Sequence, residues 1–204
     1  MRLQDARRDH YRRLAKDQGY RSRAAYKLKQ LDDSYRLLKK GYRVVDIGCA
    51  PGGWVQVAAE HVGPTGRVVG IDLKEVEPVA NAIILQGSIT DPLTPARIAD
   101  ALGEGNERSV ADVVLSDLAP NISGMWEVDH ARQIDLTRSA LALAKSILRQ
   151  GGSAVFKVFE GEFLKELKAE MTAAGFQKVL VSKPSASRQE SSELYLVCLN
   201  FAKN

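Results

Sequence analysis

Short apolar runs alternate with segments of helical periodicity along most of the chain, and this alternation limits the fold more than any other feature. Neighbouring parallel strands need a long crossover connection, usually a helix, so the pattern predicts a mostly parallel sheet covered by helices. The seven expected strands, the fourth running into a loop, span residues 42–48, 66–73, 81–87, 110–120, 153–159, 176–184 and 193–201. The expected helices span residues 22–38 (capped by Ser22), 54–62, 94–102 (capped by Thr94), 129–152 and 161–175.

The last two expected strands, 176–184 and 193–201, are too close together for a helix between them. We therefore expect them to pair as an antiparallel hairpin. The predicted fold is a doubly wound, mostly parallel seven-stranded α/β sheet that ends in this hairpin and follows an N-terminal helical extension over residues 1–38. A length of 204 residues suits one domain over 1–204.

Composition narrows the setting in which such a chain works. No run of about 18 apolar residues occurs, and the N-terminal stretch lacks the apolar segment of a secretory signal. We expect a soluble, cytoplasmic protein, monomeric and without a membrane partner. Cys49 and Cys198 lie far apart and have no histidines at metal-ligand spacing, so neither a disulfide nor a metal site is expected.

Positive charge is concentrated at the N-terminus. Residues 1–29 carry ten basic and three acidic side chains, a net charge of +7, whereas the whole chain carries +4 and the remainder therefore −3. A basic arm on a mildly acidic body is typical of proteins that bind nucleic acid, although a solvated charged leader has the same composition. The basic residues are Arg2, Arg7, Arg8, Arg12, Arg13, Lys16, Arg21, Arg23, Lys27 and Lys29.

The stretch DIGCAPGGW (46–54) places glycines directly after the first expected strand, at the sheet edge where doubly wound folds bind ligands. The spacing of Gly48, Gly52 and Gly53 differs from the G-x-G-x-x-G dinucleotide fingerprint, which disfavours an oxidoreductase. Trp54 stands where a P-loop needs lysine, which excludes a nucleotide triphosphatase.

Asp72 ends the second expected strand, where a carboxylate can accept hydrogen bonds from both hydroxyls of a ribose. A nucleoside cofactor without a diphosphate fits the turn and this acid together, and S-adenosylmethionine is the common cofactor of that kind. The alternative is a tight turn with a capping aspartate and no ligand.

Five segments, in order and in register, resemble the RrmJ/FtsJ-type 2'-O-ribose RNA methyltransferases, the ribosomal RNA large subunit methyltransferase E family. They are SRAAYKL, DIGCAPGGW, DLAPNISG, FKVFEG and KPSASRQESSELYLV. The resemblance covers almost the whole chain and implies a Rossmann-like methyltransferase fold with S-adenosylmethionine as cofactor. It places the family's catalytic tetrad on Lys27, Asp117, Lys157 and Glu193.

The chemistry of these four residues suits methyl transfer to a ribose hydroxyl. A 2'-hydroxyl is a poor nucleophile, so an enzyme must align it and receive its proton. Lys157 interrupts the apolar run AVFKVF, where an ammonium is costly unless it is paired or functional, so we expect it to be the proton acceptor or orienting group. Lys27 would act as a second ammonium, while Asp117 and Glu193 orient both amines.

The resemblance also implies cofactor contacts at Gly48, Gly52, Gly53 and Trp54 in the turn, at Asp72 on the ribose and at Asp117 near the amino-acid end. At the position where relatives can carry an aspartate that accepts a hydrogen bond from the adenine amino group, this chain has Ser88. Asp91 is a possible substitute for that aspartate.

The implied partner is RNA, by default a uridine of large-subunit ribosomal RNA. We expect Arg21, Arg23, Lys183 and Arg188 to guide its phosphates, and residues 121–130 to form a flexible lid carrying Met125 and Trp126. Tyr11 and Tyr20 could stack bases or pack in the core. A transfer RNA substrate and a non-catalytic RNA-binding ribosome assembly factor remain alternatives.

Overall fold

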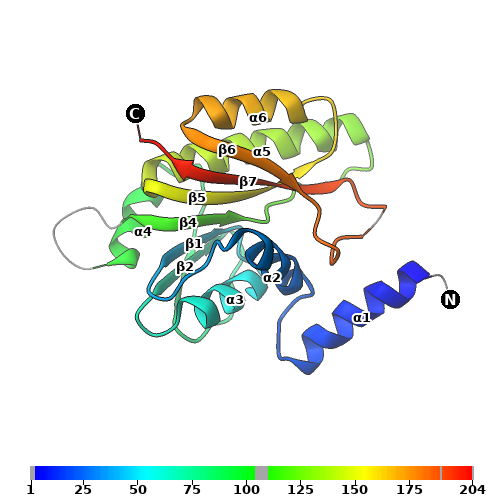
Figure 1. The fold of residues 1–204 in the computed structure, drawn as a ribbon, viewed down its shortest axis with the longest axis horizontal. Helices are drawn as coiled ribbons and strands as arrows, with labels where there is room; N and C mark the ends of the chain where they lie inside the picture. Colours follow the sequence, from blue (N-terminus) through cyan, green and yellow to red (C-terminus); the bar gives the residue numbers. More distant parts are fainter. Residues whose placement is uncertain (1–2, 104–109, 189, 204) are drawn as a thin grey trace.

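The computed structural model describes the backbone of residues 3–103, 110–188 and 190–203, with side chains from His10 onward. In this part of the chain the strands are β1 (Arg43–Ile47), β2 (Arg67–Asp72), β3 (Ala82–Gln86), β4 (Ala111–Ser116), β5 (Leu148–Phe159), β6 (Phe176–Ser182) and β7 (Glu193–Phe201). They form one sheet in the order β3-β2-β1-β4-β5-β7-β6 (Figure 1). Strands β1 to β5 are parallel, and β7 is antiparallel to both of its neighbours. The predicted fold class is therefore confirmed.

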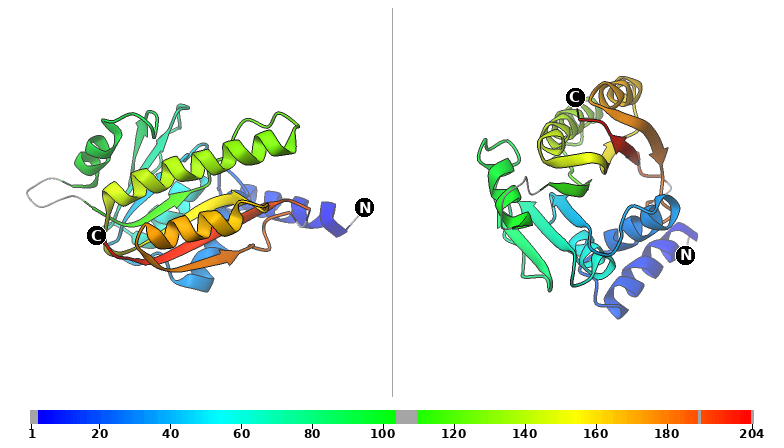
Figure 2. Two further views of the ribbon diagram at one scale, coloured as in Figure 1. Left: turned by 90° about the horizontal axis from the view of Figure 1, so that it is seen from above. Right: turned by 60° about the vertical axis from the view of Figure 1, so that its left-hand side comes forward.

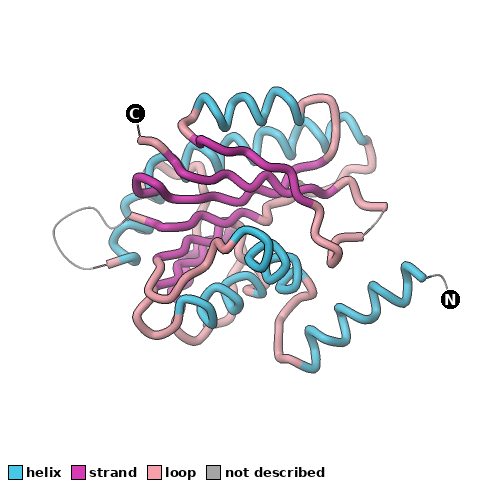
Figure 3. The backbone as a smooth tube through the Cα atoms, in the orientation of Figure 1, coloured by secondary structure: helices cyan, strands magenta, loops and turns pink. Residues whose placement is uncertain are grey.

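Helices cover both faces of this sheet (Figures 2 and 3). These helices are α2 (Ala24–Tyr35), α3 (Gly53–Val62), α4 (Thr94–Leu102), α5 (Trp126–Ile147) and α6 (Leu164–Ala173), while α1 (Leu3–Asp17) lies away from the sheet, next to α2. Helices α2 and α3 enclose one apolar core, and α4, α5 and α6 enclose the other. Among the described residues, no helix is long and apolar enough to cross a membrane.

Strand β5 illustrates how the sequence pattern produces this layering. Side chains alternate between the two faces of a strand, so Val155 enters the α2/α3 core while Phe156 and Val158 enter the α5/α6 core. All three are fully buried because helices cover both faces of the central strands. Lys157 is consequently surrounded by apolar side chains along its own strand and is only 6% exposed.

Several predicted boundaries were wrong. Helix α2 begins at Ala24 with Arg23 as its N-cap and no capping side chain, so Ser22 does not cap it. Thr94 does not cap α4 either: its hydroxyl donates to the Ser88 carbonyl, and the Asp91 carboxylate receives the Leu93 N–H.

The longest predicted helix was also misplaced at both ends. Helix α5 begins at Trp126 and ends at Ile147, and β5 begins at once at Leu148 rather than at Ser153. The first residues of β5 pair irregularly with β4, and regular pairing resumes where Ser153 meets Val113. The glycine pair at 151–152 therefore lies within an irregular part of a strand and does not end a helix.

The segment between α1 and α2 is fastened to the rest of the molecule by directed hydrogen bonds. The Arg21 guanidinium donates to the carbonyls of Pro51 (3.2 Å), Glu77 (2.6 Å) and Pro78 (2.7 Å). Further along, the Trp54 indole N–H donates to the Ala24 carbonyl at 2.7 Å, which ties α3 to the start of α2. The N-terminal extension is thus attached to the glycine turn.

Removing the Arg21 guanidinium should therefore loosen this attachment. We expect Arg21→Ala to lower the free energy of unfolding by about 1–3 kcal/mol, because three backbone carbonyls lose a charged donor. Urea denaturation would measure the change, with Arg13→Ala, an exposed arginine of α1, as the control. Equal stability of the two variants would contradict the attachment.

Candidate active site

Four elements that are distant in sequence bring the predicted tetrad together. Lys27 lies on α2, Asp117 directly follows β4, Lys157 lies near the end of β5, and Glu193 is the first residue of β7. Because β7 runs antiparallel to β5, its first residue pairs with Phe159 at the carboxyl edge of the sheet. The antiparallel direction thus places Glu193 at the edge where the sequence required it.

The four side chains form a connected cluster of ion pairs. The Lys27 Nζ is 2.8 Å from the Glu193 Oε2, and the Lys157 Nζ is 3.2 Å from the Asp117 Oδ1 and 3.9 Å from the Glu193 Oε1. The Lys157 ammonium also donates to the main-chain carbonyl of Asp117 at 2.9 Å. Two ammonium groups therefore face two carboxylates, and Glu193 connects them.

Burial makes these charges depend on one another. Lys27 and Lys157 are 5% and 6% exposed, so neither ammonium has much access to water. Burial by itself would raise the pKa of Glu193, but the ammonium groups of Lys27 and Lys157 outweigh burial and lower it. Glu193 is therefore held as a carboxylate, and its charge offsets the cost of burying two cations.

Tyr195 joins this cluster, although the sequence analysis did not single it out. Its hydroxyl donates to the Asp117 Oδ1 at 2.8 Å, and its backbone pairs with that of Lys157. Burial, with the Asp117 carboxylate beside the hydroxyl, raises the pKa of Tyr195 well above its ordinary value. Tyr195 lies two residues after Glu193 and therefore on the same face of the strand. This spacing could have predicted that Tyr195 belongs to the site.

Gln133 was also missed. This fully buried side chain of α5 donates from its Nε2 to the carbonyls of Lys157 (2.9 Å) and Leu118 (3.2 Å). It thereby connects the strand that carries Lys157 to the loop that carries Asp117. No periodicity or motif in the sequence distinguishes it from other polar residues of a long helix.

The glycine turn packs closely against its neighbours. Gly48 and Gly52 have φ values of 75° and 109°, which favour glycine. A side chain at Gly48 would collide with Leu118, and one at Gly52 or Gly53 would meet Arg21 or Ser22. Trp54 is 3% exposed, and its indole points toward α2. A ligand at this turn would thus meet the backbone of these residues.

Asp72 lies at the end of β2, as predicted, with its carboxylate fixed by two backbone donors. Its Oδ2 accepts from the Ala50 N–H (2.9 Å) and its Oδ1 from the Lys74 N–H (2.8 Å). Each carboxylate oxygen can accept a further hydrogen bond, so the group remains able to bind hydroxyls. Ser88 follows β3, and its hydroxyl is shared with that of Thr90 at 2.8 Å.

Asp46 is a buried acid on β1, close to this edge of the sheet. It is 1% exposed, and neither of its carboxylate oxygens has a hydrogen-bond partner. Burial raises its pKa well above the ordinary value, and the nearby carboxylates of Asp117 and Asp72 add to this effect. These effects favour the protonated acid in the folded chain. The interruption of the run VVDIG by a charge could have identified Asp46.

The residues expected to hold RNA phosphates divide into two groups. Arg21 is engaged with backbone carbonyls, so its guanidinium acts as a fastening rather than a free phosphate contact. It nevertheless lines a pocket of about 510 Å³ between α1, the following linker and the β6–β7 loop. The other basic residues of this pocket are Arg12, Lys16, Arg23 and Arg188.

Two further expectations about this surface have different outcomes. Tyr20 is 8% exposed and donates to Glu60, so it packs in the core and does not stack bases. Arg2 lies outside the described residues, as do the side chains of Arg7 and Arg8.

A doubly wound sheet with this strand order, an acidic ligand edge and no phosphate-binding loop defines a Rossmann-like methyltransferase. The chain belongs to the FtsJ-like methyltransferase family, whose sequence model matches residues 20–201. The family predicted from the five motifs is therefore confirmed.

Individual relatives agree with this assignment. A protein of Cenarchaeum symbiosum named ribosomal RNA large subunit methyltransferase E is 48% identical over 201 residues, which cover 98% of this chain and 99% of the relative. A protein of the same name from Methanothrix thermoacetophila is 51% identical over 194 residues, covering 93% and 71%. A crystal structure from Plasmodium falciparum, described as a ribosomal RNA methyltransferase, superposes with a TM-score of 0.77 at 34% identity and covers 89% of this chain and 98% of that one.

The unpaired carboxylate of Asp46 predicts a measurable stability effect. Because its pKa is raised, ionisation costs folding free energy at neutral pH, and Asp46→Asn should raise the free energy of unfolding at pH 7 by about 1 kcal/mol or more. The gain should disappear below the ordinary pKa of 3.8, where the carboxyl is protonated in both folded and unfolded chains.

Urea denaturation of the wild type and the variant at pH 7 and pH 3.5 would measure this difference. Asp33→Asn, an exposed change on α2, is the control. Destabilisation of the Asp46→Asn variant at pH 7 would contradict the assignment of an uncompensated buried carboxylate.

Proposed function

We propose that this chain transfers the methyl group of S-adenosylmethionine to the ribose 2'-hydroxyl of a uridine in large-subunit ribosomal RNA. The observation that carries the proposal is the cluster of Lys27, Asp117, Lys157 and Glu193 at the carboxyl edge of the sheet, beside the acidic glycine turn. The family and the names of the relatives support methyl transfer to ribosomal RNA.

The cofactor would bind along the edge formed by the glycine turn. In this proposal the backbone of Gly48, Gly52, Gly53 and Trp54 lines it, Asp72 binds the ribose hydroxyls, Ser88 accepts from the adenine, and Asp117 lies near the amino-acid end. When bound, S-adenosylmethionine supplies a methyl group made electrophilic by the positive charge on sulfur. The carboxylates of Asp72 and Asp117 at this edge support a site for a cofactor with hydroxyl and cationic groups.

The tetrad would act on the hydroxyl rather than on the methyl group. After its own proton has been released, the neutral Lys157 amine holds the 2'-hydroxyl in line and receives the hydroxyl proton as the new O–C bond forms and the bond between sulfur and the methyl carbon breaks. Asp117 and Glu193 fix the position of the Lys157 amine, and Lys27 anchors Glu193 at 2.8 Å. Tyr195 holds the Asp117 carboxylate and Gln133 holds the Lys157 backbone through hydrogen bonds, so both residues position the groups that react.

RNA would be held by the N-terminal extension, residues 1–38, as part of a single methyltransferase domain. The basic pocket beside α1 supports contacts with backbone phosphates. All four tetrad residues come from one chain, which supports a monomeric enzyme. We propose that it acts in the cytoplasm, where RNA assembled into large ribosomal subunits is available.

The decisive experiment uses methyl-labelled S-adenosylmethionine with naked ribosomal RNA, large subunits and transfer RNA in separate reactions, followed by digestion to nucleosides. Labelled 2'-O-methyluridine from ribosomal RNA or subunits is the expected product. Label in transfer RNA would identify the alternative substrate. Cofactor binding without label in any RNA would favour an assembly factor.

The same assay tests the role of Lys157. We expect Lys157→Ala to lower kcat by about 100- to 10,000-fold, because it removes the group that takes the proton. Its dissociation constant for S-adenosylmethionine, measured by calorimetry, should stay within about two-fold of wild type, and Lys165→Ala, an exposed change on α6, is the control. Loss of cofactor binding would assign Lys157 to the cofactor site instead.

The basic pocket predicts a change in the salt dependence of RNA binding. Replacing Arg12, Lys16 and Arg188 with alanine should weaken binding and reduce the slope of log affinity against log salt by up to about two to three, since each lost phosphate contact contributes roughly 0.7–0.9. Fluorescence anisotropy of labelled RNA between 50 and 300 mM salt would measure it.

The charge-matched control replaces Lys145, Lys165 and Lys178, which are exposed on other surfaces. An equal slope in both triple variants would exclude the pocket from RNA binding. These point substitutions are preferable to deleting the arm, because Ala15 and Tyr20 belong to the core.

A further inference from the structure

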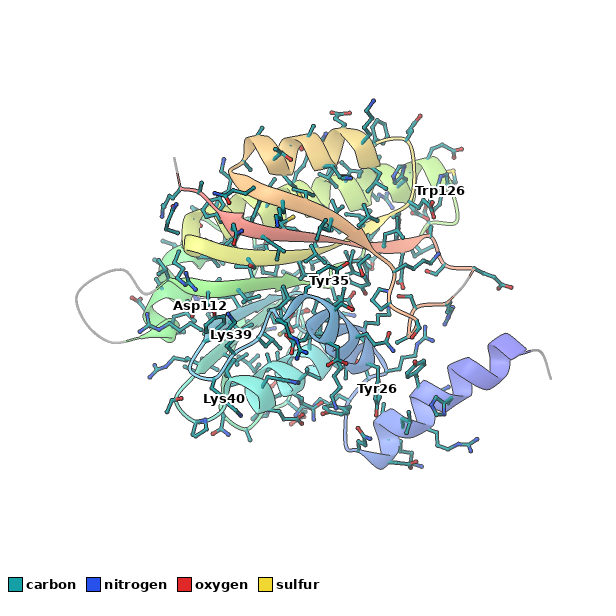
Figure 4. All side chains as sticks on the ribbon, in the orientation of Figure 1. Tyr26, Tyr35, Lys39, Lys40, Asp112 and Trp126 are labelled. Carbon is teal, nitrogen blue, oxygen red and sulfur yellow. The ribbon has the colours of Figure 1, made fainter. Side chains whose placement is uncertain are left out.

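A cluster of apolar side chains is exposed next to the candidate active site, where the loop after β4 meets α5. Ile122, Met125 and Trp126 are 66%, 59% and 45% exposed, and Phe163, before α6, is 37% exposed. Trp126 is the first residue of α5 and lies at the end of the molecule where β5 finishes (Figures 1 and 4). The proposed mechanism gives these residues no task.

Trp126 is supported from within by other aromatic rings. Its ring is stacked on His130, with centroids 5.3 Å apart and planes 13° apart, and on Phe159, at 6.0 Å and 27°. His130 in turn contacts Phe163 at 5.4 Å. His130 and Phe159 are buried, whereas Trp126 is 45% exposed. The indole is therefore held in a fixed position and loses little freedom when a ligand covers its exposed part.

The backbone that precedes Trp126 is also fixed. The Asp129 carboxylate accepts hydrogen bonds from the N–H and hydroxyl of Ser123 (2.8 and 2.7 Å) and from the N–H of Gly124 (3.1 Å). The segment expected to form a lid, residues 121–130, thus consists of a short loop fastened to the first turn of α5. These hydrogen bonds help to hold Trp126 in place.

This surface adjoins the tetrad along two paths. Trp126 lies nine positions after Asp117 in the chain. Phe159, on which Trp126 stacks, lies two residues after Lys157 and pairs in register with Glu193. The basic pocket adjoins the N-terminal extension that carries Lys27, so cationic and aromatic surfaces lie next to different members of the tetrad.

We propose that Trp126 is a stacking site for an unpaired nucleobase of the RNA, next to the nucleotide whose ribose is methylated. This inference rests on the proposed function and adds to it a contact that selects single-stranded RNA. RNA-binding proteins commonly splay unpaired bases onto aromatic side chains, and such a contact needs no charge and tolerates any base. A ribose 2'-hydroxyl can reach a recessed lysine only if its nucleotide leaves the helix, which frees neighbouring bases to stack.

Tryptophan fluorescence tests the contact directly. The chain has two tryptophans, and Trp54 is only 3% exposed. Titration with a ten-nucleotide uridine-rich single-stranded RNA should quench the emission of the wild type in a saturable manner. The Trp126→Phe variant should bind the same RNA with little quenching, because only buried Trp54 then reports.

Kinetics test its importance for the reaction. Base stacking on an aromatic side chain corresponds to a roughly 5- to 100-fold effect, so Trp126→Ala should lower kcat/KM for RNA by about that factor. The dissociation constant for S-adenosylmethionine should not change, and Trp126→Phe should restore most of the activity. Leu180→Ala, which removes an apolar side chain of similar exposure from β6, is the control and should match wild type.

Three other results are distinguishable. RNA binding to the wild type without quenching of Trp126 would overturn the proposal. So would a defect of Trp126→Ala on large subunits but not on naked RNA, since Trp126 would then contact a ribosomal protein. Quenching by RNA in a wild-type protein that methylates no RNA would leave the stacking site standing and remove the proposed function instead.

Discussion

The Glu193 carboxylate is the interaction on which the arrangement of this site depends. It pairs with Lys27 at 2.8 Å and lies 3.9 Å from Lys157, so it joins a helix of the N-terminal extension to the centre of the sheet. Two largely buried ammonium groups would repel each other and lack solvation without an anion between them. The antiparallel strand β7 is what makes this possible, because a parallel strand would start at the opposite edge.

The attachment of the N-terminal extension and the shape of the glycine turn depend on the same contacts. Arg21 donates to the carbonyl of Pro51 within the turn, and side chains at Gly52 or Gly53 would meet Arg21 or Ser22. These glycines are therefore needed for packing of the extension as well as for approach of a ligand. The segment that carries the basic pocket is built onto the ligand edge itself, and a change in one must displace the other.

Local signals in the sequence predicted the sheet, its hairpin and Lys157, whereas Lys27, Asp117 and Glu193 were predicted from the resemblance to a family. Lys157 stood out as a charge in an apolar strand, and the same argument applied to Asp46 would have predicted its unusual burial. Gln133 and Tyr195 could not be found in this way, since a glutamine in a helix and a tyrosine in a strand are ordinary residues. Their importance comes from partners 15 to 78 residues away, such as Leu118 for Gln133 and Asp117 for Tyr195. The C-terminal end of α5 was misplaced because Gly151 and Gly152 resemble the glycines that commonly end a helix, although they lie in an irregular part of β5.

The glycine turn and the basic pocket are connected through the N-terminal extension. Asp46 is buried at this edge without a hydrogen-bond partner, whereas Asp72 accepts two backbone N–H groups and Asp117 faces Lys157. Burial and the neighbouring carboxylates raise the pKa of Asp46, so the protonated acid is favoured in the folded chain. Arg21 fastens the extension to the carbonyl of Pro51 at the same edge, and the extension carries Arg12, Lys16 and Arg23 of the basic pocket. The hydrogen bonds of Arg21 therefore help to fix the position of the basic pocket relative to the glycine turn.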